Sequence, residues 1–254
     1  MVDTGLKGKR VLVTGGAAGL GRAIALAFAQ EGANLILVDI NEQGLADTSN
    51  EIRALGVACD GHRLDLMIEE DVKAFGAKMC AEHDAIDVLV NNAGLAYGEA
   101  SRGFEDLSLE TWQKFLTINT VMPLIIAQAL RPALAKAKGI IINQSSMASN
   151  VPSTVYGVTK AALNAMTCGM ANRFASDGIR VNAVEPGLME TPANLAGLTD
   201  ETYKRVQSMQ LLPLHGTAED IANLYVFLAS KQGRFINKEI ILCDAGNVMR
   251  GWRY

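Results

Sequence analysis

The chain has 254 residues, of which 49% are hydrophobic and 20% charged, and its formal net charge is −4. A chain of this length and composition can bury a large core, which excludes a mainly disordered protein. The acidic balance and the lack of a basic patch also argue against nucleic acid or an anionic membrane surface as a partner.

Cysteine usage and the start of the chain both predict a cytoplasmic protein. The four cysteines stand singly, with no Cys-x-x-Cys pair, as is typical of reduced thiols. The N-terminal stretch has no signal-peptide core or cleavage site, and the longest apolar runs, such as VMPLIIAQAL, are too short or too interrupted to span a bilayer. The three histidines are too dispersed to form a site with cysteines or carboxylates, so no metal is expected.

Along the chain, short apolar runs alternate with longer helical patterns. The runs that we predict to be strands are 9–14, 34–39, 61–65, 87–92, 139–144, 179–184 and 239–244. Their nearly continuous apolar character is typical of strands buried on both faces of a parallel sheet. The alternation predicts an α/β fold, a single-domain Rossmann-type doubly wound parallel sheet with helices on both faces, spanning residues 1–254.

One segment, residues 187–216, breaks this alternation and is predicted to be a mobile excursion or a small helical insert. In doubly wound sheets, ligands bind outside the carboxyl ends of the strands. We therefore expect the chemistry in the turns after the first, second, fourth, fifth and sixth strands.

The turn after the first strand, TGGAAGLG at residues 14–21, has the features of a phosphate-binding turn. Gly15 suits a tight turn, Gly19 allows the backbone to approach a phosphate, and Gly21 allows the following helix to pack on the sheet. The amides at the start of that helix then face the anion. With a strand before it and a helix after it, this turn predicts a dinucleotide site.

Asp39, at the end of the second strand, decides between the two nicotinamide cofactors. A carboxylate at this place accepts hydrogen bonds from the hydroxyls of the adenosine ribose and repels a 2′-phosphate. A protein that binds NADP would offer a cation here, but Ile40 and Asn41 follow Asp39, and the glycine turn has no cation before Arg22. We therefore expect NAD.

Tyr156 and Lys160 lie four residues apart in the stretch STVYGVTKAALN, which otherwise has the pattern of an apolar helix. Side chains at this spacing share one helix face. A lysine ammonium beside a phenol is expected to lower the pKa of the tyrosine, which could then exchange a proton with an alcohol or carbonyl oxygen. The fifth strand delivers Ser145 and Ser146 to the same edge of the sheet.

Together these motifs resemble those of the short-chain dehydrogenase/reductase family, in its branch of about this chain length. The resemblance covers nearly the whole chain and rests on TGGAAGLG, Asp39, the pair at 65–66, NNAG at 91–94, Asn119, SSMA, YGVTK and RVNAVEPGLMET at 180–191. It implies a Rossmann-type fold and a nicotinamide-dependent oxidoreductase.

The resemblance also implies a role for each matching position. Tyr156 is then the catalytic acid and base, Lys160 lowers its pKa and binds the nicotinamide ribose, and Asn119 holds a water that links Lys160 to solvent. Ser146 binds the substrate oxygen, with Ser145 as the alternative, because neighbouring strand residues point to opposite faces and only one can serve. The positions implied to bind the cofactor are Gly15, Gly19, Leu20, Gly21, Asp39, Ile40, Asp65, Leu66, Asn92, Gly94, Tyr156, Lys160, Pro186, Gly187 and Thr191.

Two stretches depart from the family pattern. The interval between Ser146 and Tyr156 is a few residues shorter than is common, which puts the pocket wall formed there in question. Near the C-terminus, Asn237 and Lys238 stand where the family usually has a Thr-Gly pair, a change that we interpret as structural.

We therefore expect an NAD-dependent oxidoreductase that interconverts an alcohol, in the first place a secondary one, and a ketone. The segment 187–216 carries several Leu and Met residues against only Lys204 and Arg205 as cations, which favours an apolar or weakly polar substrate. Met147 and Met189 are candidates to line its pocket. Two other functions stay open: a 3-oxoacyl thioester reductase, a type that commonly prefers NADP, and an NAD-binding scaffold without turnover.

The two long helical patterns, 110–136 and 154–176, carry more apolar surface than one covering layer needs. Since the family usually pairs these helices between subunits, we expect a homotetramer, with a dimer as the alternative. Pro123 lacks an amide hydrogen and should distort the first helix near the carbonyl of Asn119. The aromatic C-terminus, residues 251–254, is expected either to fray or to dock near a subunit interface.

Overall fold

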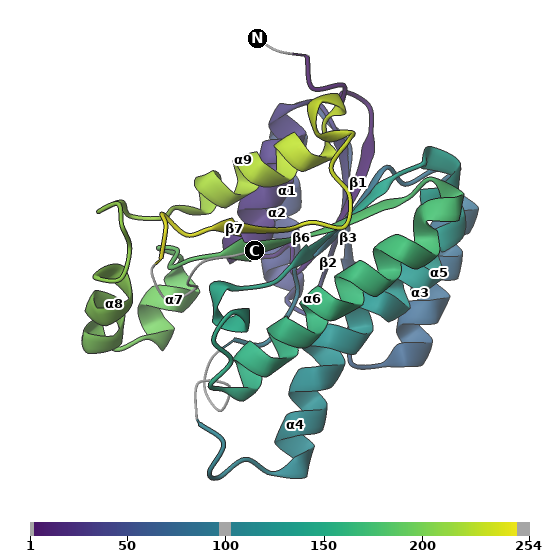
Figure 1. Cartoon of the computed structure of the whole chain (residues 1–254). Coiled ribbons are helices and arrows are strands. Elements are labelled where there is room, and N and C mark those ends of the chain that lie inside the picture. Colours follow the sequence, from purple (N-terminus) through teal and green to yellow (C-terminus); the bar gives the residue numbers. More distant parts are fainter. Residues whose placement is uncertain (1–2, 97–102, 248–254) are drawn as a thin grey trace.

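A computed structural model describes residues 3–96 and 103–247, and a sheet of seven parallel strands forms its centre (Figure 1). The strands are β1 (Arg10–Thr14), β2 (Asn34–Asp39), β3 (Cys59–Arg63), β4 (Val88–Asn91), β5 (Ile140–Gln144), β6 (Arg180–Pro186) and β7 (Ile240–Cys243). Their order, β3-β2-β1-β4-β5-β6-β7, confirms the predicted doubly wound, Rossmann-type sheet. The C-terminal residues 251–254 lie outside the described part of the chain.

Helices cover both faces of the sheet, as Figure 1 shows. Two apolar cores lie between the sheet and these helices, and alternate residues of β1 divide between them: Val11 and Val13 belong to one core and Leu12 to the other. The first core lies under α1 (Gly19–Gln30), α2 (Glu42–Ala54) and α9 (Ala218–Ala229), and the second under α3 (Glu69–Glu82), α5 (Met122–Ala137) and α6 (Val155–Phe174).

The third strand begins and ends two residues earlier than predicted. The prediction followed the sequence GHRLD to residue 65, but β3 ends at Arg63 and pairs with β2 from Leu35 to Asp39. β3 is an edge strand in which only Cys59 is buried, so it lacks the apolar run that marks the inner strands. The apolar residues that follow it pack into the second core and do not belong to the sheet.

The long helical pattern predicted at 110–136 is interrupted, as Pro123 indicated. The chain passes from α4 (Leu109–Leu116) through a π-helical turn (Thr117–Val121) into α5, which has Pro123 in its first turn. Because proline has no N–H, it cannot continue a regular helical ladder through this turn. The whole stretch is long and apolar enough to cross a membrane, but 50% of its most apolar window is buried, and α5 packs on the sheet as a core helix.

Residues 187–216 form the helical insert that was one of the two predicted alternatives. They contain α7 (Pro192–Gly197) and α8 (Asp200–Gln207), which lie beyond the carboxyl ends of β6 and β7 in Figure 1. The Tyr203 hydroxyl of α8 donates a hydrogen bond of 2.6 Å to the carboxylate of Glu190, and this contact connects α8 to the start of the insert.

Candidate active site

The glycine turn has the geometry that its sequence predicts. Gly15 has a φ of +69°, in the left-handed region that favours glycine. A Cβ on Gly21 would lie 2.0 Å from the Gly15 carbonyl oxygen, so α1 can pack this closely only because a side chain is missing there. At Gly19 an added Cβ would meet nothing within 4 Å, so the turn faces open space at the start of α1, where a phosphate can approach.

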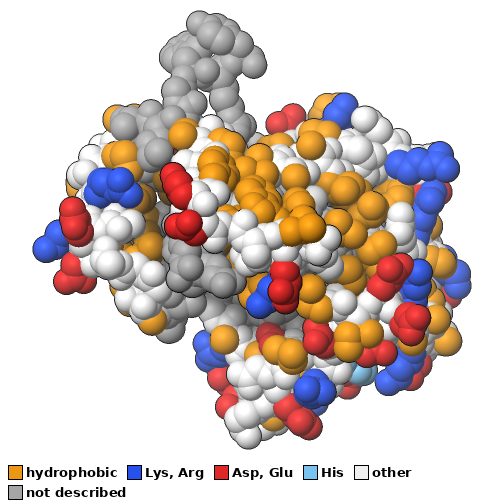
Figure 2. Space-filling model, turned by 90° about the horizontal axis from the view of Figure 1, so that it is seen from below, with side chains coloured by type: hydrophobic (Ala, Val, Ile, Leu, Met, Phe, Trp, Pro, Cys, Tyr) orange, Lys and Arg blue, Asp and Glu red, His pale blue; other side chains and the backbone are white. Residues whose placement is uncertain are grey.

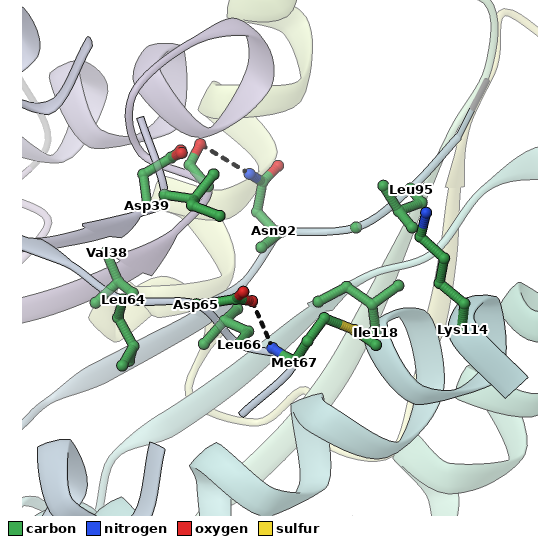
Figure 3. A pocket seen from close by; sticks show the side chains of 14 residues that line it. Val38, Asp39, Leu64, Asp65, Leu66, Met67, Asn92, Leu95, Lys114 and Ile118 are labelled. Atoms are coloured by element: carbon green, nitrogen blue, oxygen red, sulfur yellow. Dashed lines mark hydrogen bonds between the residues drawn. The ribbon is translucent and has the colours of Figure 1, made fainter. Parts of the chain in front are cut away.

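Asn92, just after β4, holds this turn in place. Its side-chain amide donates to the carbonyl oxygens of Thr14 (2.9 Å) and Gly15 (3.3 Å), and its N–H donates to the Thr14 hydroxyl (3.0 Å). Figure 3 shows Asn92 beside the cavity that opens next to the turn. The sequence placed Asn92 along the cofactor, and its contacts show that it also fixes the shape of the glycine turn.

That cavity has a volume of about 430 Å³ and lies at the carboxyl ends of β1, β2, β3 and β4. It is lined by predicted cofactor positions, namely Gly15, Asp39, Ile40, Asp65, Leu66, Asn92 and Gly94. It is also lined by residues that no motif marked, among them Met67, Leu95, Lys114 and Ile118. Lys114 and Ile118 have helical i, i+4 spacing, but the sequence did not show which surface that helix face would contact.

The carboxylate of Asp39 is oriented by two backbone amides. One oxygen accepts from the N–H of Ala17 in the glycine turn (3.1 Å), and the other accepts from the N–H of Asn41 (3.0 Å). Figure 3 places Asp39 at one side of the cavity, with Asp65 below it and Lys114 on the opposite side. Asp39 therefore presents a fixed negative charge at the end of β2.

A second cavity, of about 890 Å³, adjoins the first, because Asn92, Gly94 and Leu95 line both. All but two of the remaining predicted positions line it. These lining positions are Gly19, Leu20, Ser146, Tyr156, Lys160, Pro186, Gly187 and Thr191. The two exceptions are Gly21, which packs beneath the turn, and Asn119, which is fully buried. The structure thus brings the predicted residues to one edge of the sheet.

The two serines after β5 have different partners. Ser145 is buried, and its hydroxyl donates to the carbonyl oxygen of Lys160 at 3.3 Å. The Ser146 oxygen accepts from the N–H of Ala148 (3.2 Å), and the Ser146 side chain lies close enough to Tyr156 to lower its pKa by hydrogen bonding. Ser146 rather than Ser145 therefore acts on the tyrosine, and Ser146 stays the preferred prediction for the catalytic serine.

The pKa of Tyr156 is raised, whereas the sequence predicted that it would be lowered. Burial is the larger cause, because it disfavours the phenolate, and the hydrogen bond with Ser146 opposes it. The Lys160 ammonium lies 5.6 Å from the centre of the Tyr156 ring, but it donates to the carbonyl oxygen of Gln144 at 2.7 Å. Burial lowers the pKa of Lys160 itself to about 8. The spacing of Tyr156 and Lys160 was visible in the sequence, but the burial of Lys160 and the partial burial of Tyr156 were not.

The side chain of Asn119 is hydrogen-bonded to the backbone of Leu95. Its amide oxygen accepts from the N–H of Leu95 (2.9 Å), and its amide nitrogen donates to the Leu95 carbonyl (3.0 Å) and to the Thr159 hydroxyl (3.2 Å). A Cβ on Gly94 would lie 2.5 Å from the Asn119 amide oxygen, so this contact requires glycine. Because these contacts occupy the side chain, the group of Asn119 that could bind a relay water is its backbone carbonyl, which lies in the π-helical turn.

The outer part of the second cavity has a mostly apolar wall, which the sequence indicated only in part. Met147 and Met189, the two candidates, both line it. Most of the other apolar lining residues come from the loop after β5, the insert and β7, namely Val151, Leu188, Leu198, Val206, Met209 and Leu242. Asp244 and Asn247, after β7, also line it and were missed, because no motif of the sequence marked the end of the last strand.

Comparisons with known proteins agree with this geometry. A family model described as enoyl-(acyl carrier protein) reductase matches residues 15–247. The 3-oxoacyl-[acyl-carrier-protein] reductase of Thermotoga maritima is 32% identical over 96% of this chain and 99% of its own length. The chain belongs to the short-chain dehydrogenase/reductase family. The 2-dehydro-3-deoxy-D-gluconate 5-dehydrogenase of Bacillus subtilis, a further relative, is 34% identical over 96% of each chain.

Two solved structures show the same fold with a nicotinamide cofactor. A 7α-hydroxysteroid dehydrogenase complexed with NADH and 7-oxo glycochenodeoxycholic acid has a TM-score of 0.89 and 29% identity, covering 97% of each chain. L-sorbose reductase from Gluconobacter frateurii, complexed with NADPH and L-sorbose, has a TM-score of 0.88 and 27% identity, covering 99% of this chain and 100% of that one. As a member of this family, the protein is an oxidoreductase, and its fold is one that binds nicotinamide cofactors.

The different partners of the two serines predict different effects of removing each hydroxyl. If Ser146 has the role that the family resemblance implies, Ser146→Ala should lower kcat by about 10²-fold or more, because the substrate oxygen would lose a hydrogen-bond donor. It should also move the ascending limb of the pH–rate profile for alcohol oxidation to higher pH, because the hydrogen bond that lowers the pKa of Tyr156 is lost. Ser145→Ala is the matched control and should change thermal stability more than kcat. Equal losses of kcat in the two variants would contradict this assignment.

Proposed function

We propose that this short-chain dehydrogenase/reductase interconverts a secondary alcohol and a ketone with NAD. The observation that carries the proposal is the position of Tyr156, which lies near Ser146 and Lys160 and lines a cavity that adjoins the Asp39 site. A substrate oxygen in this cavity can contact both hydroxyls. The glycine turn, open at Gly19, fits a dinucleotide, whose nicotinamide supplies or accepts the hydride when bound.

The residues of the chain then control the proton and the position of the substrate oxygen. Tyr156 takes the proton of the alcohol in oxidation and returns it in reduction. Ser146 can donate its own hydrogen, because its oxygen already accepts from the N–H of Ala148. Lys160 places a positive charge beside the phenolate that forms. Residues of α8 line the cavity and reduce the access of water.

The charges around Asp39 support NAD over NADP. Arg22 is engaged in an ion pair with Glu51. Arg63 is the register partner of Asp39 on β3, but it is exposed and does not line the cavity. Lys114 lines the cavity on the side opposite Asp39 (Figure 3). A carboxylate rather than a cation therefore borders the cavity at the end of β2, where a 2′-phosphate would be repelled.

The composition of the second cavity supports an apolar or weakly polar substrate. Its outer wall is built mainly from aliphatic and Met side chains, and Arg205 is the one cation that the insert adds to it. The 7α-hydroxysteroid dehydrogenase, which has the same fold, forms a complex with 7-oxo glycochenodeoxycholic acid, a molecule with a large apolar body. A polyanionic substrate would find little compensating charge in this cavity.

The direct test is NADH formation by the purified protein with a panel of secondary alcohols of increasing apolar size. The proposal requires turnover with NAD and a kcat/KM that rises with apolar size. A chain that binds NADH but turns over no alcohol or ketone would instead be a binding scaffold.

A 3-oxoacyl thioester reductase is the second candidate, because the Thermotoga maritima relative carries that name. The carbonyl chemistry at Tyr156 would be the same, and only the outer part of the substrate would differ. Acetoacetyl-CoA distinguishes the two candidates. A kcat/KM for acetoacetyl-CoA above that for every simple ketone would favour the thioester reductase.

The role of Asp39 predicts a change of cofactor preference on its removal. Asp39→Ala should raise the ratio of kcat/KM for NADP over NAD by at least about tenfold, because close like charges cost more than about 1.4 kcal/mol. Asp65→Ala, on the same cavity, is the matched control and should weaken both cofactors without changing their ratio. A wild-type protein that uses NADP as well as NAD at limiting concentrations would show that our interpretation of Asp39 is wrong.

We also propose that the subunits form a homotetramer, with a dimer as the alternative. Figure 2 shows hydrophobic side chains gathered in a band on one face of the molecule. On α6, the residues that keep exposed surface include Val158, Ala162, Ala165 and Gly169, which recur every three or four positions and form one small, apolar stripe. Val121, before α5, is 40% exposed. Such a surface allows two helices to approach closely.

Light scattering tests the assembly with one pair of variants. The wild-type protein should have four times the subunit mass at micromolar concentration, and Ala165→Arg on α6 should reduce this mass. Ala54→Arg, at an exposed position of α2, is the matched control and should leave the mass unchanged. A monomeric wild-type protein would contradict the proposal.

A cytoplasmic location is also proposed. The four cysteines are all within the described residues, and all are free, which fits a reducing compartment.

A further inference from the structure

A glutamate carboxylate lies fully buried behind the loop that carries Ser146. Glu185, on β6, has 0% of its surface exposed. Its carboxylate accepts hydrogen bonds from the Ser149 hydroxyl, from the side-chain amide of Asn150 (3.0 Å) and from the side-chain amide of Asn164 (2.6 Å). The three donors are neutral groups from two other parts of the chain.

These donors connect Glu185 to both halves of the catalytic pair. Ser149 ends, and Asn150 follows, the short 3₁₀ turn that begins directly after Ser146. Asn164 lies in α6, eight residues and about two helical turns beyond Tyr156. One carboxylate on β6 therefore fixes the loop that bears the serine against the helix that bears the tyrosine. The amide of Asn164 also donates to the Ser149 hydroxyl at 3.0 Å, which closes the network.

The loop after Ser146 is short, and its middle is exposed. Only nine residues separate Ser146 from Tyr156, and Val151, Pro152 and Ser153 in the middle of this interval are exposed. These three residues therefore bury little surface that could fix the loop. The contacts that help to hold its first half include the hydrogen bonds of the 3₁₀ turn and those to Glu185.

A carboxylate in this place is costly unless its hydrogen bonds are made. Removing a charged group from water disfavours folding, and the loss is offset only by well-aligned donors. The neighbours of Glu185 along the strand, Val184 and Pro186, are apolar and buried. Displacement of Ser149, Asn150 or Asn164 would remove a hydrogen bond from a buried carboxyl group, so Glu185 constrains the positions of these three donors.

We propose that Glu185 is a positioning residue for catalysis, which sets the distance between the Ser146 and Tyr156 hydroxyls by holding the serine loop and α6 to the same strand. The proposal rests on the proposed function, in which these two hydroxyls contact the substrate oxygen. Asn150 also lines the second cavity, so the same network fixes one wall of the substrate pocket.

The variant that tests this is Glu185→Gln, which keeps the shape but turns one acceptor oxygen into a donor that faces either the amide of Asn150 or the amide of Asn164. The kcat for alcohol oxidation should fall roughly tenfold to a hundredfold, as expected when reacting groups are slightly misplaced. The KM for NAD should stay unchanged. The ascending limb of the pH–rate profile should move to higher pH, because a weaker hydrogen bond from Ser146 lowers the pKa of Tyr156 less.

The matched control is Asn182→Ala, on the same strand. Asn182 is also fully buried, but its side chain bonds to the Ile236 carbonyl (3.1 Å) and the Glu239 N–H (3.0 Å), away from the serine loop. It should lower the melting temperature without moving the pH–rate profile. If Glu185→Gln lost activity only in proportion to its loss of stability, with the same pH–rate profile as the wild type, the proposal would be wrong.

Hydrogen exchange separates this proposal from the proposed function, because it needs no substrate. The backbone amides of residues 147–150 should exchange at least about tenfold faster in Glu185→Gln than in the wild type, and at the wild-type rate in Asn182→Ala. If Glu185→Gln exchanged faster but the wild-type protein turned over no alcohol, the positioning role of Glu185 would be supported and only the proposed function would be overturned. Unchanged exchange in Glu185→Gln would overturn the anchor, whatever the activity.

Discussion

The hydrogen bond between Ser146 and Tyr156 opposes the effect of burial on the phenol. Burial favours the neutral hydroxyl and the hydrogen bond favours the phenolate, so the proton affinity of Tyr156 depends on where Ser146 lies. Ser146 is followed by a 3₁₀ turn that Glu185 holds, and the buried ammonium of Lys160 adds a positive charge nearby. The proposed reaction therefore depends on the placement of one serine hydroxyl, which the strand beneath it controls.

Much of the site could be predicted from the sequence because its signals are local or follow from the topology. Gly15 allows a left-handed backbone conformation, and Gly21 allows α1 to pack closely on the Gly15 carbonyl within the same turn. Tyr156 and Lys160 are related by helical spacing. The parallel order of the strands then brings their carboxyl ends, and Asp39 with them, to a common edge. These features need no knowledge of distant packing.

The remaining features depend on packing between distant segments, which spacing does not show. The direction of the Tyr156 pKa shift was predicted wrongly, because burial of the phenol raises its pKa more than the hydrogen bond with Ser146 lowers it. Lys114 and Asp244 line the cavities from a helix and a strand end that no motif marks. Glu185 stands in a matching motif, and only the folded structure shows that its partners lie 35 and 21 residues away along the chain.

The most direct test of the account is the turnover and cofactor binding of Tyr156→Phe, measured with NAD and the best secondary alcohol. The phenyl ring keeps the shape of the site and loses only the group that transfers the proton. We predict that kcat falls by about 10²- to 10⁴-fold, the range typical of general acid–base catalysis, while the dissociation constant for NADH changes little. A variant that keeps a substantial fraction of the wild-type kcat would contradict the central role of Tyr156.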